Sequence, residues 1–128
     1  SGTNERYCLD KAYEGFMTII EKYPESIHYQ NALYYVGHLN YEDSRYAESK
    51  MNLLELIQSK EEYGFFTRLA YFDLAEIAIE EKDYKLAKYY LGQIQQRSNK
   101  TGRCGNEVVP DYKRLKTLEQ RVAYSSKL

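Results

Sequence analysis

The 128-residue chain has no tryptophan, two prolines, two cysteines and no excess of charge of either sign. Its 18 basic and 19 acidic side chains nearly cancel, which argues against nucleic acid as a partner and against an anionic membrane surface. No apolar run approaches the ~18–20 residues that a membrane span needs, so we expect no direct membrane insertion. The scarcity of proline suits long helices joined by short turns.

Motifs for metal or nucleophile chemistry are missing as well. His28 and His38 are ten residues apart, a spacing that does not place them on one helical face. No His-Glu-x-x-His, Cys-x-x-Cys, phosphate-binding loop or nucleophile elbow occurs. We expect Cys8 and Cys104 to be two reduced thiols, and a disulfide between them stays open for an oxidising compartment. The sequence therefore predicts no enzyme, no metal and no cofactor.

Tyrosine is the residue that the chain has in excess, with 15 Tyr beside 4 Phe. A Tyr ring supplies a large contact area and keeps a polar tip, which suits helix contacts that are only partly dry. Apolar residues recur with the period of amphipathic helices along most of the chain. We expect a single domain over residues 1–128, divided into a helix at 4–23, a helix pair at 26–60, a second pair at 62–97 whose helices run over 62–81 and 84–96, a loop at 98–109 and a last helix at 110–125.

Turn-forming residues set the expected helix ends. Pro24 stops the first helix, Ser26 is expected to cap the second, and Asp43 or Ser44 is expected to cap the third. The last helix begins at Pro110, and we expect it to cap the array with a polar outer side. Its basic residues are placed on faces away from its apolar stripe; they are Lys113, Arg114, Lys116 and Arg121.

Chemically matched residues recur at a step of 38 positions. The pairs are Gly37 with Ala75, Tyr46 with Tyr84, Ser49 with Ala87, and Leu53 with Leu91. A repeat of this length cannot bury its own apolar face, so neighbouring repeats must stack into a continuous surface. Gly in mid-helix costs roughly 1 kcal/mol relative to Ala, and we expect a close helix crossing at Gly37 to offset that cost.

These residues resemble the tetratricopeptide repeat, whose pattern has Leu-Gly on a leading helix and Ala followed by an aromatic on a trailing helix. The resemblance covers roughly residues 9 to 95. It implies an all-α, right-handed α-solenoid of antiparallel helix pairs, with about six helices and a C-terminal capping helix. The matching segments are Leu33-x-x-Val36-Gly37, Tyr71-x-x-Leu74-Ala75, Ala12-x-x-x-Phe16, Ser49-x-x-x-Leu53 and Ala87-x-x-x-Leu91. Asn40 and Ala78 depart from it, since the family has Tyr there.

One segment is similar to the long-linker variant of this family found in bacterial envelope proteins. Such proteins place Tyr-Pro-x-Ser before an Ala-Leu-Tyr-x-x-Gly helix, and they include the Tol–Pal-associated periplasmic factor and the outer-membrane assembly lipoprotein. The chain has Tyr23-Pro24-Glu25-Ser26 before Asn31-Ala32-Leu33-Tyr34-Tyr35-Val36-Gly37. The resemblance favours the periplasm or cell envelope and leaves the cytoplasm open. The leading helix of the first repeat is missing, so we expect a partial chain.

The same resemblance implies a concave groove lined by the leading helices, which reads a protein or peptide segment. The residues expected there are Asn31, Tyr34, Tyr35, His38 and Tyr41 from one repeat, and Arg68, Phe72, Asp73 and Glu76 from the next. Tyr34, His38 and Tyr41 are three or four residues apart and so share one helix face. Leu69, Asp73 and Glu76 stand where carboxylate-reading members carry basic or amide side chains, so we expect an apolar or basic segment as partner.

Two alternatives to this interaction module stay open. The chain could be a regulatory or sensory domain excised from a larger protein, with effector chemistry elsewhere. It could also be a structural array that associates with a second copy through Cys8, Phe16 and Ile20 of its first helix.

Overall fold

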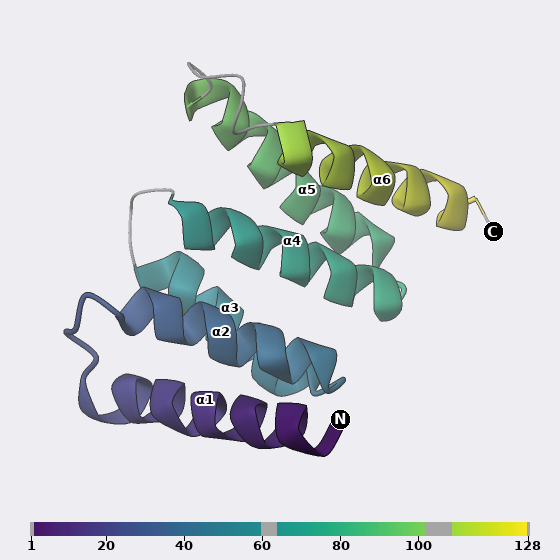
Figure 1. The fold of residues 1–128 in the computed structure, drawn as a ribbon. Helices are drawn as coiled ribbons and strands as arrows, with labels where there is room; N and C mark the ends of the chain where they lie inside the picture. Colours follow the sequence, from purple (N-terminus) through teal and green to yellow (C-terminus); the bar gives the residue numbers. More distant parts are fainter. Residues whose placement is uncertain (1, 60–63, 102–108, 128) are drawn as a thin grey trace. The chain divides into compact units, whose positions relative to one another are not determined.

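The computed structural model describes residues 2–59, 64–101 and 109–127 of the chain. Six α-helices and no β-strand occur in these ranges, and neighbouring helices pack in pairs (Figure 1). The expectation of an all-α fold with about six helices is confirmed for the described residues. The helices are α1 (Gly2–Lys22), α2 (Tyr29–Glu42), α3 (Tyr46–Ser59), α4 (Phe65–Glu80), α5 (Tyr84–Thr101) and α6 (Val109–Ser125).

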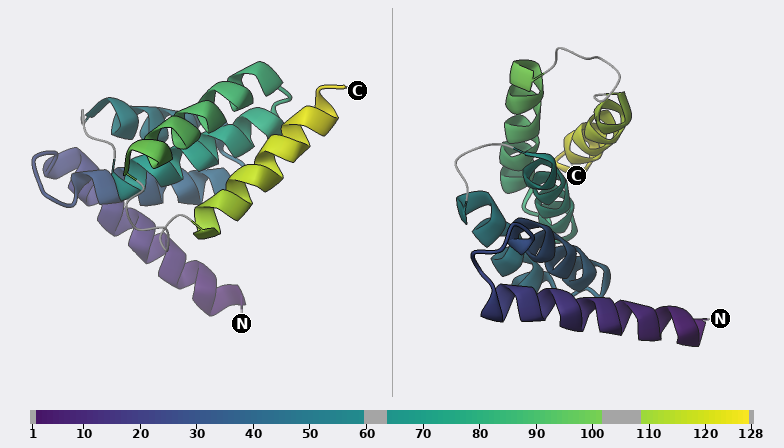
Figure 2. Two further views of the ribbon diagram at one scale, coloured as in Figure 1. Left: turned by 90° about the horizontal axis from the view of Figure 1, so that it is seen from above. Right: turned by 60° about the vertical axis from the view of Figure 1, so that its left-hand side comes forward.

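The helices fall into two compact units, described here one at a time. Unit 1 spans residues 1–62 and holds α1, α2 and α3, while unit 2 spans residues 63–128 and holds α4, α5 and α6. Within each unit successive helices run in opposite directions (Figures 1 and 2). In unit 2, α4 and α6 therefore run in the same direction and α5 runs in the opposite direction. In unit 2, α6 packs against both α4 and α5.

The close crossing expected at Gly37 is present between α2 and α3. A Cβ atom at Gly37 would lie 2.8 Å from Cδ2 of Leu53, which is fully buried. The hydroxyl of Ser49 donates a hydrogen bond of 2.6 Å to the carbonyl oxygen of Gly37, and Ser49 is also fully buried. Ala87, the match of Ser49 in unit 2, is buried in the same way.

Ala12 on α1, the small residue of the segment Ala12-x-x-x-Phe16, is exposed. In the described chain α1 packs against α2 through a different side, on which Tyr13 donates a 3.4 Å hydrogen bond to Oδ1 of buried Asn40. Asn40 in turn donates to Asn52 at 3.0 Å. Asn40 thus links three helices of unit 1 by polar contacts.

The turns after α2 and α4 have the same geometry, 38 residues apart. Ser44 and Lys82 adopt φ of 61° and 62°, the left-handed region. In the first turn the N–H of Ser44 donates to Tyr41 O at 2.9 Å and that of Arg45 donates to Asn40 O at 2.8 Å. The corresponding distances in the second turn are 3.0 and 2.8 Å. These paired bonds define a Schellman motif, which satisfies the carbonyls at a helix C-terminus.

The expected cap of α3 is therefore wrong. Asp43 and Ser44 belong to the C-terminal end of α2, and Arg45 is the residue that precedes α3. The turn after α4 differs in one respect, because Asp83 does cap its helix: Oδ1 of Asp83 accepts the N–H of Leu86 at 3.2 Å.

The expected cap of α2 is wrong as well. Ser26 accepts the N–H of His28 at 3.1 Å and so forms a local turn, while α2 begins only at Tyr29. His28 is the N-cap residue and its side chain makes no capping hydrogen bond. A Ser hydroxyl that accepts the N–H of the residue two positions later is no longer available to cap a helix.

The boundary of the loop expected at 98–109 is corrected at both ends. α5 continues to Thr101 and α6 begins at Val109, so residues 98–101 and 109 are helical; residues 102–108 lie outside the described residues. Ser98 and Asn99 are weak helix formers, but each costs well under 1 kcal/mol and neither removes a backbone donor. The helix therefore continues through Ser98 and Asn99 to Thr101.

Candidate functional site

The aromatic side chains of α2 in unit 1 form a continuous row of ring contacts. Phe16 of α1 stacks on Tyr35 with ring centroids 5.2 Å apart and planes inclined by 17°. Tyr35 meets Tyr34 edge to face at 5.3 Å, and Tyr34 stacks on His38 at 5.5 Å. Tyr41 then lies 6.2 Å from His38. We call these five residues the aromatic row; rings at such separations attract one another beyond their buried area.

His38 is held by hydrogen bonds at both ring nitrogens. Its Nε2 lies 2.7 Å from Oε1 of Glu42, one helical turn further along α2. Its Nδ1 lies 3.4 Å from the hydroxyl of Tyr34. In the neutral ring, Nε2–H donates to the carboxylate and Nδ1 accepts from the phenol. This arrangement fixes the plane of the imidazole within the row.

Exposure divides the residues expected on α2. Tyr35 is 40 % exposed, whereas Tyr34 is only 6 % exposed. His38, Tyr41 and Asn31 are half-buried. The side-chain oxygen of Asn31 is buried, and no protein group described here donates a hydrogen bond to it. The five residues lie on one helix as expected, but a ligand would reach them mainly through Tyr35, His38 and Tyr41.

The residues expected on α4 in unit 2 have a different environment. Phe72 and Asp73 are fully buried, and Glu76 and Arg68 are half-buried. The guanidinium of Arg114 on α6 lies 4.6 Å from the Phe72 ring centroid. Its Nη2 lies 3.2 Å from Oδ1 of Asp73 and 2.7 Å from Oε2 of Glu76. In this structure α6 therefore occupies the part of α4 that carries Phe72, Asp73 and Glu76.

Arg114 corrects the expectation that the basic residues of the last helix face away from the fold. Burial acts to lower the pKa of Arg114, but Glu76 and Asp73 outweigh it and raise that pKa above its ordinary value. One feature of the sequence could have indicated this contact: Arg114 immediately precedes Leu115 in the apolar stripe, so it lies beside the buried face of α6. Its partners Asp73 and Glu76 are about 40 positions away, and no sequence motif connects them with Arg114.

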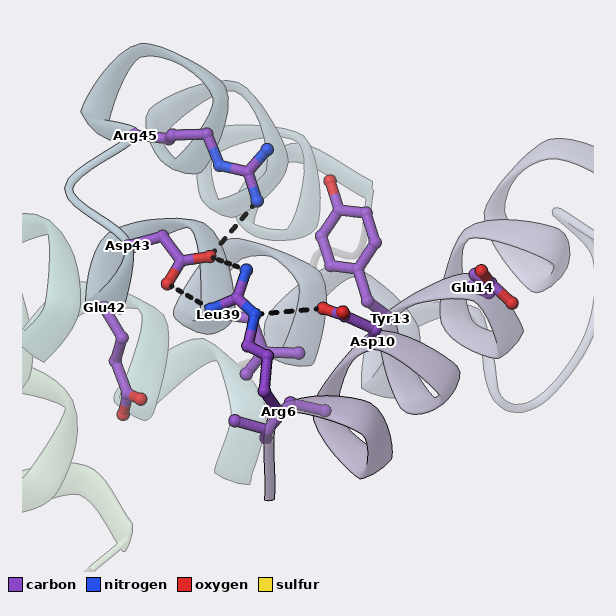
Figure 3. A pocket seen from close by; sticks show the side chains of 9 residues that line it. Arg6, Asp10, Tyr13, Glu14, Leu39, Glu42, Asp43 and Arg45 are labelled. Atoms are coloured by element: carbon purple, nitrogen blue, oxygen red, sulfur yellow. Dashed lines mark hydrogen bonds and ion pairs between the residues drawn. The ribbon is translucent and has the colours of Figure 1, made fainter. Parts of the chain in front are cut away.

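A cavity of about 310 Å³ lies between α1 and the end of α2 in unit 1 (Figure 3). Arg6 meets Asp43 through two nitrogens, each 3.2 Å from a carboxylate oxygen, and Arg45 meets the same carboxylate at 3.2 Å. The hydrogen bond from Arg6, together with both guanidinium charges, holds the pKa of Asp43 below its ordinary value. Nε of Arg6 also lies 3.3 Å from Asp10. From the sequence, Asp43 was considered only as a cap of the third helix, and its pairing with Arg6 was missed because it joins positions 37 apart.

Neither family membership nor function comes from comparison with known proteins. No family model, no curated protein and no solved structure matches this chain. The resemblance to the tetratricopeptide repeat therefore stays a prediction that depends on the residues quoted for it.

Among residues 2–59, 64–101 and 109–127, no three His, Cys, Asp or Glu side chains gather as a metal would require. Within the same ranges, every helix is too short or too polar to span a bilayer. Cys8 is exposed with a free thiol, and Cys104 lies outside the described residues. The first-helix set expected for self-association is split, since Phe16 stacks on Tyr35 while Cys8 faces solvent.

Proposed function

We propose that this chain is a non-enzymatic protein–protein interaction module. It is a right-handed α-solenoid of the tetratricopeptide type that binds a peptide or protein segment through the aromatic row on α2. The resemblance of its linker and α2 to bacterial envelope proteins favours a scaffold role in an envelope-associated assembly.

The observation that carries this proposal is the aromatic row itself. Its rings lie 5.2–6.2 Å apart, and it combines the exposed ring of Tyr35 with the half-buried rings of His38 and Tyr41. Binding surfaces are enriched in aromatic side chains that are already fixed by packing, because little conformational entropy is then lost on binding. The bonds from His38 to Glu42 and Tyr34 provide this fixation.

The partner expected at this surface is an apolar or basic segment. Aromatic faces attract both apolar side chains and cations. Glu42, next to His38 along the row, adds a carboxylate that is more than half exposed. A cationic side chain stacked on Tyr35 or Tyr41 could therefore also approach an acidic oxygen.

A peptide-display selection against the full chain tests the proposal. We expect enriched peptides to combine aromatic or aliphatic residues with Lys or Arg, and to bind with a dissociation constant on the order of micromolar by isothermal titration calorimetry. Tyr35→Ala and His38→Ala should each weaken binding by about tenfold, as expected for a residue near the centre of an interface.

Tyr89→Ala is the matched control, because Tyr89 is 57 % exposed but lies on α5 of unit 2 and is not a member of the aromatic row. Its affinity should equal that of the wild type. Failure to enrich any peptide, or equal affinity for the Tyr35→Ala and Tyr89→Ala chains, would overturn the proposed binding surface.

A further inference from the structure

The contacts between α6 and α4 follow a common spacing in the two helices. Arg114 pairs with Asp73 and Glu76, and Arg121 pairs with Glu80 at 3.7 Å. The two arginines are seven residues apart, as are Asp73 and Glu80, and seven residues make two turns of an α-helix. Because α4 and α6 run in the same direction within unit 2 (Figure 2), the two charge patterns stay in register.

The side chains of α6 also supply an apolar component. Leu115, Leu118 and Val122 are buried, at spacings of three and four residues that make one helix face. Next to this face, the Arg114 guanidinium covers the fully buried ring of Phe72. The surface of unit 2 therefore accepts an amphipathic helix whose apolar stripe is bordered by cations.

Asp73 makes this surface selective. Its side chain is fully buried, so its charge must be compensated by a group that covers it. A cation with several directed donors does this, as the guanidinium of Arg114 does by reaching Asp73 and Glu76 together. An acidic helix in the same place would bring its own carboxylates against Asp73 and Glu76, and a purely apolar helix would lose the charged bonds that Arg114 makes to both.

Parts of the contact with α6 are weak enough to be improved by another helix. Arg121 and Glu80 are 46 % and 51 % exposed, and ion pairs at such sites contribute little. Arg114 remains 34 % exposed, so solvent reaches one side of the cluster. The contacts between α6 and α4 are made by side chains, so a helix of another chain with the same side chains can make them too.

We propose that the acidic strip of α4, formed by Phe72, Asp73, Glu76 and Glu80, is a docking surface for a basic amphipathic helix, and that α6 is its internal occupant. A partner helix with two arginines seven residues apart beside an apolar stripe displaces α6. While α6 occupies the acidic strip, segments without this pattern do not bind there. This site lies in unit 2, and its argument does not depend on the aromatic row of unit 1.

The test uses the full chain and a synthetic peptide of residues 109–127, which carries the contact pattern of α6. An attached helix competes at an effective concentration on the order of millimolar, so the peptide should bind the wild-type chain only at about that concentration. In the Arg114→Gln chain the internal helix loses its charged bonds, and the peptide should bind about tenfold more tightly. Fluorescence anisotropy of the labelled peptide measures both affinities.

Two controls identify the site of binding. A peptide with Arg114→Gln should lose the gain on the Arg114→Gln chain. Adding Asp73→Asn to that chain should weaken binding of the unaltered peptide by about tenfold, because the charged acceptor is gone. Circular dichroism checks that each chain keeps its helix content.

Hydrogen exchange on the wild-type chain gives a readout that does not depend on any variant. Saturating peptide should speed amide exchange in α6 while α4 stays protected. Unchanged protection of α6 at saturation, or equal peptide affinity for the wild-type and Arg114→Gln chains, would overturn the proposal and make α6 a fixed part of the fold. Absence of binding to either chain would overturn it too.

Discussion

Gly37→Ala is expected to destabilise the protein, although the same change stabilises most helices. Alanine is favoured over glycine in a helix interior by roughly 1 kcal/mol. At Gly37, however, the new methyl carbon would lie 2.8 and 2.9 Å from Cδ2 and Cγ of Leu53, and 3.3 Å from Cβ of Asn52. Leu53 is fully buried and cannot turn toward solvent. Overpacking of this kind costs about 1–3 kcal/mol, so we expect a net loss of about 1 kcal/mol.

The chain offers two matched controls. Gly15 on α1 and Gly92 on α5 are also helical, and a Cβ atom at either position would have no neighbour within 4 Å. Gly15→Ala and Gly92→Ala should therefore each stabilise the protein by about 1 kcal/mol. The contrast between these variants and Gly37→Ala, about 2 kcal/mol, separates the effect of the crossing from helix propensity.

Urea unfolding followed by circular dichroism measures the free energy of unfolding, and amide exchange in α2 and α3 localises the change. A second test removes the obstacle. In a Leu53→Ala background, Gly37→Ala should become stabilising, because Cδ2 and Cγ of Leu53, the two atoms nearest to the new methyl carbon, are gone. A Gly37→Ala protein as stable as Gly15→Ala in the wild-type background would refute the close crossing.

Three further changes have definite expected outcomes. Ser49→Ala removes a buried hydrogen bond of 2.6 Å and should cost about 1 kcal/mol in urea unfolding. Lys82→Gly should raise stability by about 0.5–1 kcal/mol, because Lys82 sits at φ of 62°, where a side chain is strained. Burial and the 2.8 Å bond to Glu55 raise the pKa of Tyr29 to about 12. Since that pKa lies above the ordinary value of 10, the contribution of Tyr29 to stability is complete below pH 10 and is lost as pH rises toward 12. The difference in absorbance titration between the wild type and Tyr29→Phe should show the late-titrating phenol, and a phenol titrating near pH 10 would contradict the bond.

The sequence predicted best those features that repeat at a fixed spacing. The 38-residue step indicated the crossing, and both Gly37 and Ser49 lie where it places them. Helix ends were predicted less well. Ser26 and Ser44 are both residues that favour capping, but one makes a turn within the linker and the other takes a left-handed conformation. The competition between such local arrangements is decided by the chain on either side of the residue.

The candidate surfaces were predictable only in part. Helical periodicity predicted that Tyr34, His38 and Tyr41 share one face of α2. The stacking of Phe16 on Tyr35 joins two helices and was not predicted. The environment of Phe72 and Asp73 does not follow from periodicity, because it is set by Arg114 on a helix about 40 residues away. Pairing between distant helices depends on how far each helix extends and how it docks. These quantities have no local sequence signature.

The two Schellman turns have a consequence for how this chain can be lengthened. Their defining hydrogen bonds join main-chain atoms, and their left-handed residues, Ser44 and Lys82, share no chemistry except tolerance of that conformation. A duplicated segment of residues 45–82 would thus begin and end at equivalent backbone geometry. The side chains at the two turns differ, because Asp43 anchors Arg6 of α1 in the first turn and Asp83 caps α5 in the second. A segment grafted between two such turns would therefore meet the same hydrogen-bonded main chain at both of its ends, whatever side chains its surface carries.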